Sequence, residues 1–428
     1  MMVYALQSNM STFSSADEQH KYLEQAAPFL ILFMCLELII SWIWKGKPIH
    51  INERLTSLSA GILSLLPDAL IIEIELLFYI HIWNNYRLFD LPEDSPWTWW
   101  LTFLGMDFAF YWLHRTVHEV HFIWATHQVH HSAETYNLSL ALRIPILQRY
   151  TDWVFYLPLA LFIPVPVFSA CFQFSLLYQF GIHTEIIDNL GPLELILNTP
   201  SHHRVHHGRN PYYVDSNFGG VLIIWDKLFG TFVPEKETVI FGLIHPINTF
   251  ELFQVQFHYY GHMWNSLRNS PGVCNKLSVL FKGPRWSPGK PRLGLREDIP
   301  PVTGKELPYN PKMPVYLQVY TVLHVFIILE CFLDLFLNKM LSQITILLRI
   351  AYIILTLTSM GFLMEQRPKA AILETVRCSS FLILQQYGYL TSNFTYLVLI
   401  YEILFWICTA FWGAQSIKQV VRDKVKQY

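Results

Sequence analysis

Histidines gather in three short clusters in the middle of the chain. The sequence has 18 histidines, and 11 of them fall between residues 114 and 207. The clusters read HRTVH, HQVHH and HRVHH, and their members are His114 and His118; His127, His130 and His131; His203, His206 and His207. Spacings of three and four residues place side chains on one face of a helix. Each cluster is therefore expected to direct its imidazoles toward one point.

The number of clustered histidines bears on the number of metal ions. Neutral imidazole suits zinc, copper, nickel and iron. A single zinc takes three or four ligands, so the eight clustered histidines exceed what one ion needs. The spacing predicts two metal ions without identifying them, and His183 is predicted as a ninth ligand. His121 and His202 are expected outside the ligand set, because His121 lies a turn beyond His118 and His202 points away from His203.

Acidic side chains near the clusters are expected to balance the metal charge and to orient ligand rings through their second nitrogens. Glu119, directly after His118, is predicted to have this catalytic role. The weaker candidates are Asp107, Glu134, Glu185 and Asp226. Nearby arginines, any of which could contact a polar head group, a pterin or a lipid phosphate or be simple cytosolic flanking charge, are Arg115, Arg143, Arg204 and Arg209.

The composition indicates a membrane protein. Hydrophobic residues make up 53% of the chain and charged residues only 14%, about half the charged share of soluble domains. The net charge of -2 leaves no basic surface for a nucleic acid, so no nucleic-acid partner is expected. The six cysteines are scattered without CxxC pairs and are interpreted as small apolar side chains.

Apolar runs predict an all-α, polytopic membrane protein. The first, residues 27–44, is long enough to cross a bilayer and is followed by Lys45 and Lys47, so it is interpreted as an uncleaved anchor with a lumenal N-terminus. The further runs are residues 55–83, 97–113, 153–181, 314–337, 341–364, 370–389 and 394–414. Loop charges then place the histidine-rich di-metal helical core, and the C-terminus, in the cytosol.

The run of residues 153–181 is expected to turn back within the membrane. Pro164 and Pro166 lie at its centre, and proline interrupts an ordinary helix. Histidines that must converge lie on both sides of it, at His131 and His183, so its two ends must share a membrane face. A hairpin of two short segments is preferred over one kinked span.

Five segments are predicted along the chain. They are a lumenal N-terminal tail (1–26), N-terminal transmembrane spans (27–96), a histidine-rich catalytic core (97–235), a cytosolic proline-rich segment (236–312) and a C-terminal transmembrane block with a basic cytosolic tail (313–428). The proline-rich segment is expected to be largely irregular. Lys424 and Lys426 resemble a dilysine retrieval signal of the endoplasmic reticulum, with ordinary flanking charge as the alternative.

The histidine clusters resemble the pattern of the fatty acid hydroxylase and sterol desaturase superfamily, which is HxxxH, HxxHH and, after a long gap, a second HxxHH. The stretch GGVLIIWDKLFGTF, residues 219–232, also resembles the block that follows the last cluster there. The resemblance covers about residues 97–235. Within the superfamily, YWLHRTVHEVHFIWATHQVHHSAETYNLSLALR and the C-terminal block most resemble the alkylglycerol monooxygenase family.

That resemblance implies a di-iron enzyme of the endoplasmic reticulum membrane. It would use O2 and tetrahydrobiopterin to hydroxylate the carbon next to the ether oxygen of an alkylglycerol, and the product would collapse to a fatty aldehyde and a glycerol derivative. No residue pattern indicates a pterin site. Two alternatives stay open: a sterol or fatty acyl hydroxylase or desaturase with another electron donor, and a membrane scaffold with a structural metal.

Overall fold

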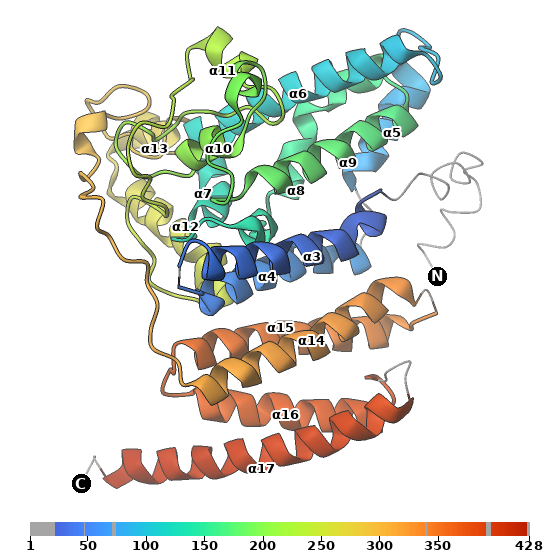
Figure 1. The fold of residues 1–428 in the computed structure, drawn as a ribbon, viewed down its shortest axis with the longest axis vertical. Helices are drawn as coiled ribbons and strands as arrows, with labels where there is room; N and C mark the ends of the chain where they lie inside the picture. The colour runs from blue at the N-terminus through green and yellow to red at the C-terminus, as the bar shows by residue number, and fades with distance from the viewer. Residues whose placement is uncertain (1–21, 47, 71–73, 339, 391–394, 426–428) are drawn as a thin grey trace.

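The computed structural model describes residues 22–425 apart from 47, 71–73, 339 and 391–394, so most of the predicted tail (1–26) and Lys426 lie outside the described residues. The described residues form helices and no strand (Figure 1), as predicted. The α-helices of the first half are α3 (Tyr22–Ile43), α4 (Ile51–Leu65), α5 (Ile74–Tyr86), α6 (Pro96–Glu119), α7 (His121–His131), α8 (Arg149–Asp152), α9 (Val165–Ile182) and α10 (Pro200–His206).

The second half continues with longer helices. They are α11 (Ile224–Phe229), α12 (Leu252–Asn269), α13 (Gly272–Phe281), α14 (Val315–Leu337), α15 (Gln343–Met364), α16 (Ala370–Gln386) and α17 (Thr395–Val425). Short 3-10 helices join these elements: η1 (Leu66–Ala69), η2 (Leu138–Leu142), η3 (Trp153–Phe155), η4 (Leu157–Leu161), η5 (Gly191–Leu195) and η6 (Arg296–Asp298). The four predicted C-terminal runs correspond to α14, α15, α16 and α17.

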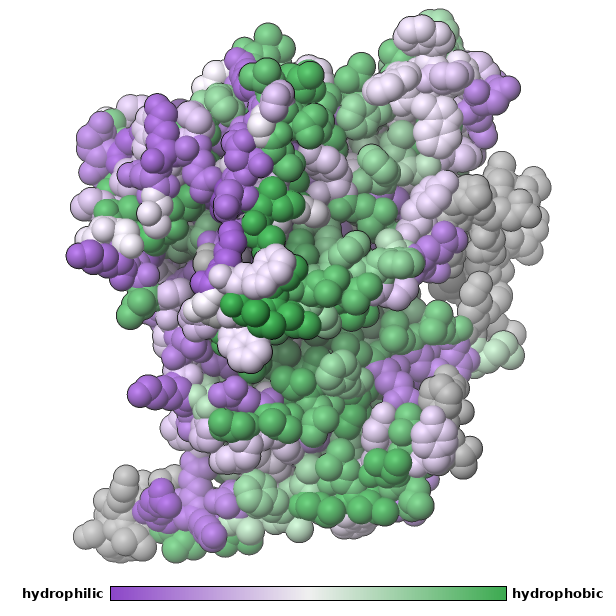
Figure 2. Space-filling model, in the orientation of Figure 1, coloured by the Kyte–Doolittle hydropathy of each residue, from purple (hydrophilic) through white to green (hydrophobic). Residues whose placement is uncertain are grey.

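Several helices are long and apolar enough to cross a bilayer, as expected of a multi-pass membrane protein. Within the described residues there are five: α3, α9, α14, α15 and residues 396–422 of α17. Hydrophobic residues cover much of the surface over α3 and α14 to α17, and hydrophilic residues gather near α12 and α13 (Figure 2). The predicted run 55–83 is not one span, because η1 (Leu66–Ala69), with Pro67 as its second residue, lies between α4 and α5.

The predicted turn within residues 153–181 is confirmed. Two 3-10 helices, η3 and η4, occupy its first half, and α9 begins only after Pro164, with Pro166 in its first turn. The chain segments before and after the run meet, since Nε2 of His130 and Nε2 of His183 lie 3.3 Å apart. The prolines therefore allow α9 to return His183 to the end of the fold that holds α7.

The expectation that residues 236–312 are largely irregular is wrong for residues 252–281, which form α12 and α13. The prolines that suggested irregularity begin only at Pro271. Before them, the Glu251 carboxylate caps α12 by accepting hydrogen bonds from the backbone N–H groups of Phe253 and Gln254. The inner face of α12 packs against α7, so this segment supports one of the histidine helices.

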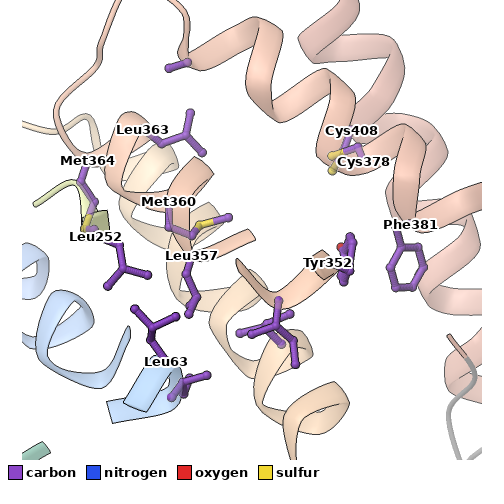
Figure 3. Close-up of a cluster of buried hydrophobic side chains, with 14 of the residues drawn as sticks. Leu63, Leu252, Tyr352, Leu357, Met360, Leu363, Met364, Cys378, Phe381 and Cys408 are labelled. Atoms are coloured by element: carbon purple, nitrogen blue, oxygen red, sulfur yellow. The ribbon is translucent and has the colours of Figure 1, made fainter. Parts of the chain in front are cut away.

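The C-terminal block is joined to the histidine-bearing part by a shared apolar core. Leu63 of α4 and Leu252 of α12 lie against Leu357 and Met360 of α15 (Figure 3). On the far side of α15, side chains of α16 and α17 continue the same cluster. Burial of large apolar side chains contributes about 1.5–3 kcal/mol each, and this core therefore fixes the position of α12 and, through it, α7.

Candidate metal centre

The nine predicted ligand histidines converge, but in two groups that cut across the sequence clusters. One group is His114, His118, His127, His131 and His206; the other is His130, His183, His203 and His207. Within each group, one ring nitrogen per residue lies within 4.8 Å of the others. The expectation that each cluster points to one place is thus wrong for the second and third clusters, whose members divide between the groups.

Helix geometry explains the division. His127 and His131 are four residues apart on α7 and share a face, whereas His130 is turned about 100° from its neighbour His131. His203 and His207 are likewise four residues apart, with His207 directly after α10. Of the remaining members, His114 and His118 come from the last turns of α6, His206 is the last residue of α10, and His183 directly follows α9.

The inner nitrogens of these rings are the strongest sign of a missing partner. Eight of the nine histidines are buried, with His130 half-buried. Nε2 has no hydrogen-bond partner among the described residues in His118, His127, His131, His206 and His207. In the other group, Nε2 of His183 lies 3.0 Å from Nε2 of His203. Buried polar atoms nearly always have a partner, so this donor set fits two bound metal ions.

The outer nitrogens of four rings lie against acceptors, which fixes the tautomer. In each of them Nδ1 donates a hydrogen bond to a carbonyl oxygen. The pairs are His114 with Phe218 O (2.9 Å), His127 with Gln148 Oε1 (3.0 Å), His183 with Gln179 O (2.6 Å) and His206 with Ser216 O (2.9 Å). Because carbonyl oxygens only accept, the proton sits on Nδ1 and the Nε2 lone pair points inward. This is the usual arrangement of metal-binding histidine.

Asp107 and Asp226 were expected to orient ligand rings directly. Instead they hold the loop that orients His114. Asp107 accepts hydrogen bonds from the backbone of Val221 and Leu222, and Asp226 accepts from the backbone of Phe218 and Gly219. Burial raises the pKa of Asp226 to about 6, opposed by these hydrogen bonds. The loop carries the Phe218 carbonyl to His114.

Two glycines let this loop approach the carboxylates. A Cβ on Gly219 would lie 2.5 Å from the Leu222 carbonyl oxygen, and one on Gly220 would lie 2.8 Å from Phe110 and 3.0 Å from the Asp107 carboxylate. Real Cβ atoms avoid such distances, so only glycine fits at these two positions. The glycine pair at the start of the GGVLIIW stretch therefore allows the loop to take the conformation that orients His114.

Glu119 lies beside His118 but its carboxylate faces arginines. Its two oxygens accept hydrogen bonds from Arg115 Nε and Arg292, each at 2.8 Å. The carboxylate near the His118 ring is instead Asp215, with Oδ1 3.5 Å from Nδ1. Sequence reasoning missed Asp215, which lies eight residues beyond the last cluster and has no spacing that marks it.

Replacing Asp215 by asparagine should weaken metal binding about 10- to 100-fold, as loss of an outer carboxylate usually does. Asparagine tolerates the left-handed backbone of this residue (φ 58°) and keeps a side-chain oxygen that can accept the hydrogen bond of Arg285, so the fold should be retained. Metal competition with a chelator, compared with thermal unfolding, measures the effect. Unchanged metal affinity would remove Asp215 from the support of His118.

The other predicted residues fall outside the two groups. His121 donates from Nδ1 to the Val279 carbonyl, and His202 packs edge-on against Phe232, as expected of non-ligands. Glu134 accepts a hydrogen bond from the Tyr309 backbone.

The arginines near the clusters have internal partners. They pair as follows: Arg115 with Glu119, Arg143 with Glu53 and Arg204 with Glu235. The alternative that the arginine is only a cytosolic flanking charge is therefore wrong for Arg143, because its ion pair with Glu53 is buried. Arg209 differs from these three, since the carbonyl of Leu243 accepts a hydrogen bond from its guanidinium.

The metal-free protein should lose stability as the pH falls below about 6.5. Burial lowers the pKa of His127 and of His183 to about 4. Between these values and the ordinary pKa, the unfolded chain binds a proton that the folded chain does not, so each residue removes about 1.4 kcal/mol per pH unit. Thermal midpoints of the metal-free protein between pH 7.5 and 5 measure this loss, and a flat profile would contradict it.

Comparison with known proteins agrees with the geometry. The fatty acid hydroxylase family matches residues 99–231, and the alkylglycerol monooxygenase C-terminal domain matches residues 317–403. Alkylglycerol monooxygenase of Xenopus tropicalis is 57% identical over 427 residues, covering 100% of this chain and 96% of the relative. The Homo sapiens protein of that name is 56% identical, covering 98% and 95%. No solved structure shows significant similarity.

A more distant relative matches only about a third of the chain. Ornithine lipid hydroxylase OlsE of Rhizobium tropici is 29% identical over 164 residues, 36% of this chain and 46% of the relative. The helical membrane fold and the two histidine groups, with these matches, define a membrane monooxygenase of the fatty acid hydroxylase class. More narrowly, the chain belongs to the alkylglycerol monooxygenase family.

Proposed function

We propose that this protein hydroxylates the carbon next to the ether oxygen of alkylglycerols, with two iron ions as the metals and with O2 and tetrahydrobiopterin as co-substrates. One oxygen atom enters the C–H bond and the other leaves as water, with two electrons and two protons from the pterin. The hemiacetal product then collapses to a fatty aldehyde and a glycerol derivative. The observation that carries the proposal is the pair of histidine groups with inward, unpaired nitrogens in a chain of this family.

The chain's own residues have separate parts in this reaction. His114, His118, His127, His131 and His206 would hold one iron, and His130, His183, His203 and His207 the other. Bound iron would supply oxygen activation. The ligand rings are buried, which would keep water away from the bound metals, and Asp215 and the loop held by Asp107 and Asp226 keep the rings in place. Glu119 would serve this centre only through Arg115 and Arg292, as a positioning residue.

We further propose that the enzyme lies in the endoplasmic reticulum membrane with this centre facing the cytosol. The segment boundaries 27–96, 97–235, 236–312 and 313–428 remain part of this proposal. Its support is the charge pattern: Lys45 follows α3, and Lys418 and Arg422 lie near the end of α17. The C-terminal end of α17 also points to the side of the fold that carries α12 and α13 (Figure 1).

The function is tested with membranes from cells that express the chain, given a 1-alkylglycerol with and without tetrahydrobiopterin. Release of fatty aldehyde should require both the pterin and O2, and membranes with His131→Ala provide the matched control. Aldehyde release without the pterin, or oxidation of a sterol or fatty acyl substrate in its place, would favour the other chemistry of this superfamily.

A further inference from the structure

Leucine and isoleucine side chains are exposed on two short elements next to the metal centre. One element is η5 with the residue that follows it, and the other is α11. The exposed fractions are 53% for Leu193, 67% for Leu195, 57% for Ile196 and 69% for Leu228. The two elements touch, because Lys227 Nζ of α11 donates hydrogen bonds to the carbonyls of Glu194 and Leu195 at 3.1 and 2.8 Å. They form one surface, called here the η5–α11 patch.

The charged groups within the patch are turned toward the protein. Glu194 lies between two exposed leucines, but its carboxylate accepts hydrogen bonds from the hydroxyls of Thr199 and Ser201 at 3.1 and 2.7 Å. Lys227 Nζ lies 4.9 Å from the centre of the Phe232 ring and ends on the two carbonyls. The outer face of the patch is therefore made mainly of apolar atoms.

The rise of α6 indicates how deep α11 lies. α6 packs along α9, one of the candidate membrane spans, and it begins with three exposed tryptophans, which favour a membrane–water interface. At about 1.5 Å per residue, Phe108 and Trp112 lie about 18 and 24 Å beyond Pro96, within a hydrocarbon core about 30 Å thick. Trp225 of α11 packs on Phe108 and Phe229 on Trp112, with ring centroids 5.1 and 5.0 Å apart. α11 therefore lies beside a part of α6 that lipid surrounds.

The segment before η5 gives a second marker of depth. α3 is another candidate span, and it ends at Ile43. Lys45, just beyond it, donates from Nζ to Asp188 Oδ1 at 3.0 Å and to the Glu185 carbonyl at 2.6 Å. A lysine directly after a span lies at the bilayer surface, so Asp188 lies there too, and η5 begins three residues later. Hydrophobic residues also gather over α11 and along the surface from there toward α3 (Figure 2).

The patch is attached to the loop that orients His114. Asn198 N donates to the Val221 carbonyl at 2.8 Å, and Ile223 N donates to the Ile196 carbonyl at 2.9 Å. The same loop carries the Phe218 carbonyl that accepts from Nδ1 of His114. One hydrogen-bonded loop therefore connects the patch with the five-histidine group.

We propose that the η5–α11 patch is inserted into the bilayer leaflet at which α3, α6 and α9 end, with its leucines and Ile196 against the hydrocarbon chains of lipids. Apolar patches of this kind are rarely left in water, and both depth markers place this one at the edge of the hydrocarbon. The inference is independent of the substrate and of which compartment this leaflet faces. It revises the predicted core (97–235), part of which then lies in lipid, and it brings lipid chains to the loop that orients His114.

The experiment places a bimane fluorophore on Leu195→Cys or on Leu228→Cys in the full-length, iron-loaded protein, reconstituted in dioleoyl phosphatidylcholine vesicles. The exposed native thiols are first removed by Cys35→Ser and Cys274→Ser. Phosphatidylcholine brominated in the upper part of its acyl chains quenches a fluorophore in hydrocarbon, and iodide quenches one in water. The brominated lipid should quench both labels at least about half as strongly as a label near the end of a span, because both lie within the hydrocarbon thickness.

The control in lipid is Val319→Cys, since Val319 is exposed in the second turn of the candidate span α14. The control in water is Glu297→Cys on η6, where the side chain is exposed; iodide should quench its label and the brominated lipid should not. Equal iron content shows that each labelled protein is folded, and Leu193→Cys replaces a variant that lacks iron.

Both patch labels must follow Val319→Cys for the proposal to stand. Quenching by iodide in the manner of Glu297→Cys would overturn it, since the patch would then face water. Protection of either label from both quenchers would also overturn it, because another protein chain would then cover the patch. Fluorescence is read without substrate, so a failure of the proposed function leaves this outcome unchanged.

Discussion

His131→Ala and His206→Ala should each abolish turnover while the protein stays folded. Both rings belong to the five-histidine group, and their centroids are 4.7 Å apart. Removing a ligand leaves the metal with an incomplete shell, so the loss should exceed the roughly 10- to 100-fold cost of losing an outer partner. Iron content per chain, aldehyde release and thermal unfolding in detergent are measured on the same preparations.

His202→Ala is the matched control for these variants. His202 is as buried as the ligands and lies next to His203, but its nearest carboxylate contact is Glu194 at 3.9 Å and it belongs to neither group. Its iron content should equal that of the wild type. Retained turnover in either ligand variant would contradict the site, whereas unfolding of both on metal loss would favour the structural-scaffold alternative.

Arg377→Met should destabilise the C-terminal block by about 3–5 kcal/mol, the usual cost of leaving one member of a buried ion pair alone. Arg377 and Glu374 are 1% and 0% exposed, and Arg377 Nε lies 2.9 and 3.0 Å from the two Glu374 oxygens. Ser359 and Tyr320 also donate to this carboxylate. Thermal midpoints of the detergent-solubilised protein should fall sharply.

The double variant Glu374→Gln with Arg377→Met should be more stable than Arg377→Met alone, because it removes the unpaired charge. Arg87→Met is the exposed control: Arg87 and Asp90 form a surface pair, and such pairs contribute only about 0–1 kcal/mol. If the double variant were as unstable as the sum of its two single changes, the pair would not explain the loss.

The histidine spacing and the apolar runs determined much of this protein in advance. HxxxH and HxxHH are local patterns, readable because the helix repeat sets which residues share a face. Likewise, a long apolar run needs no tertiary contact to be recognised in the sequence. The first three C-terminal runs match α14 to α16 closely, whereas α17 continues eleven residues past the end of the fourth run. Pro164 and Pro166 also indicated the turn before α9, since proline acts on its own backbone.

Which histidine joins which group was decided only by tertiary structure. His130 and His131 are neighbours in sequence yet belong to different groups. The helix repeat turns their side chains about 100° apart, and the positions of α6, α10 and the end of α9 around α7 decide which histidines each of them meets. Asp215, the η5–α11 patch and the pairing of Glu119 with Arg292 have the same origin. Each is a contact between segments whose separation in the chain carries no periodic signal, so packing of the helices and loops alone brings them together.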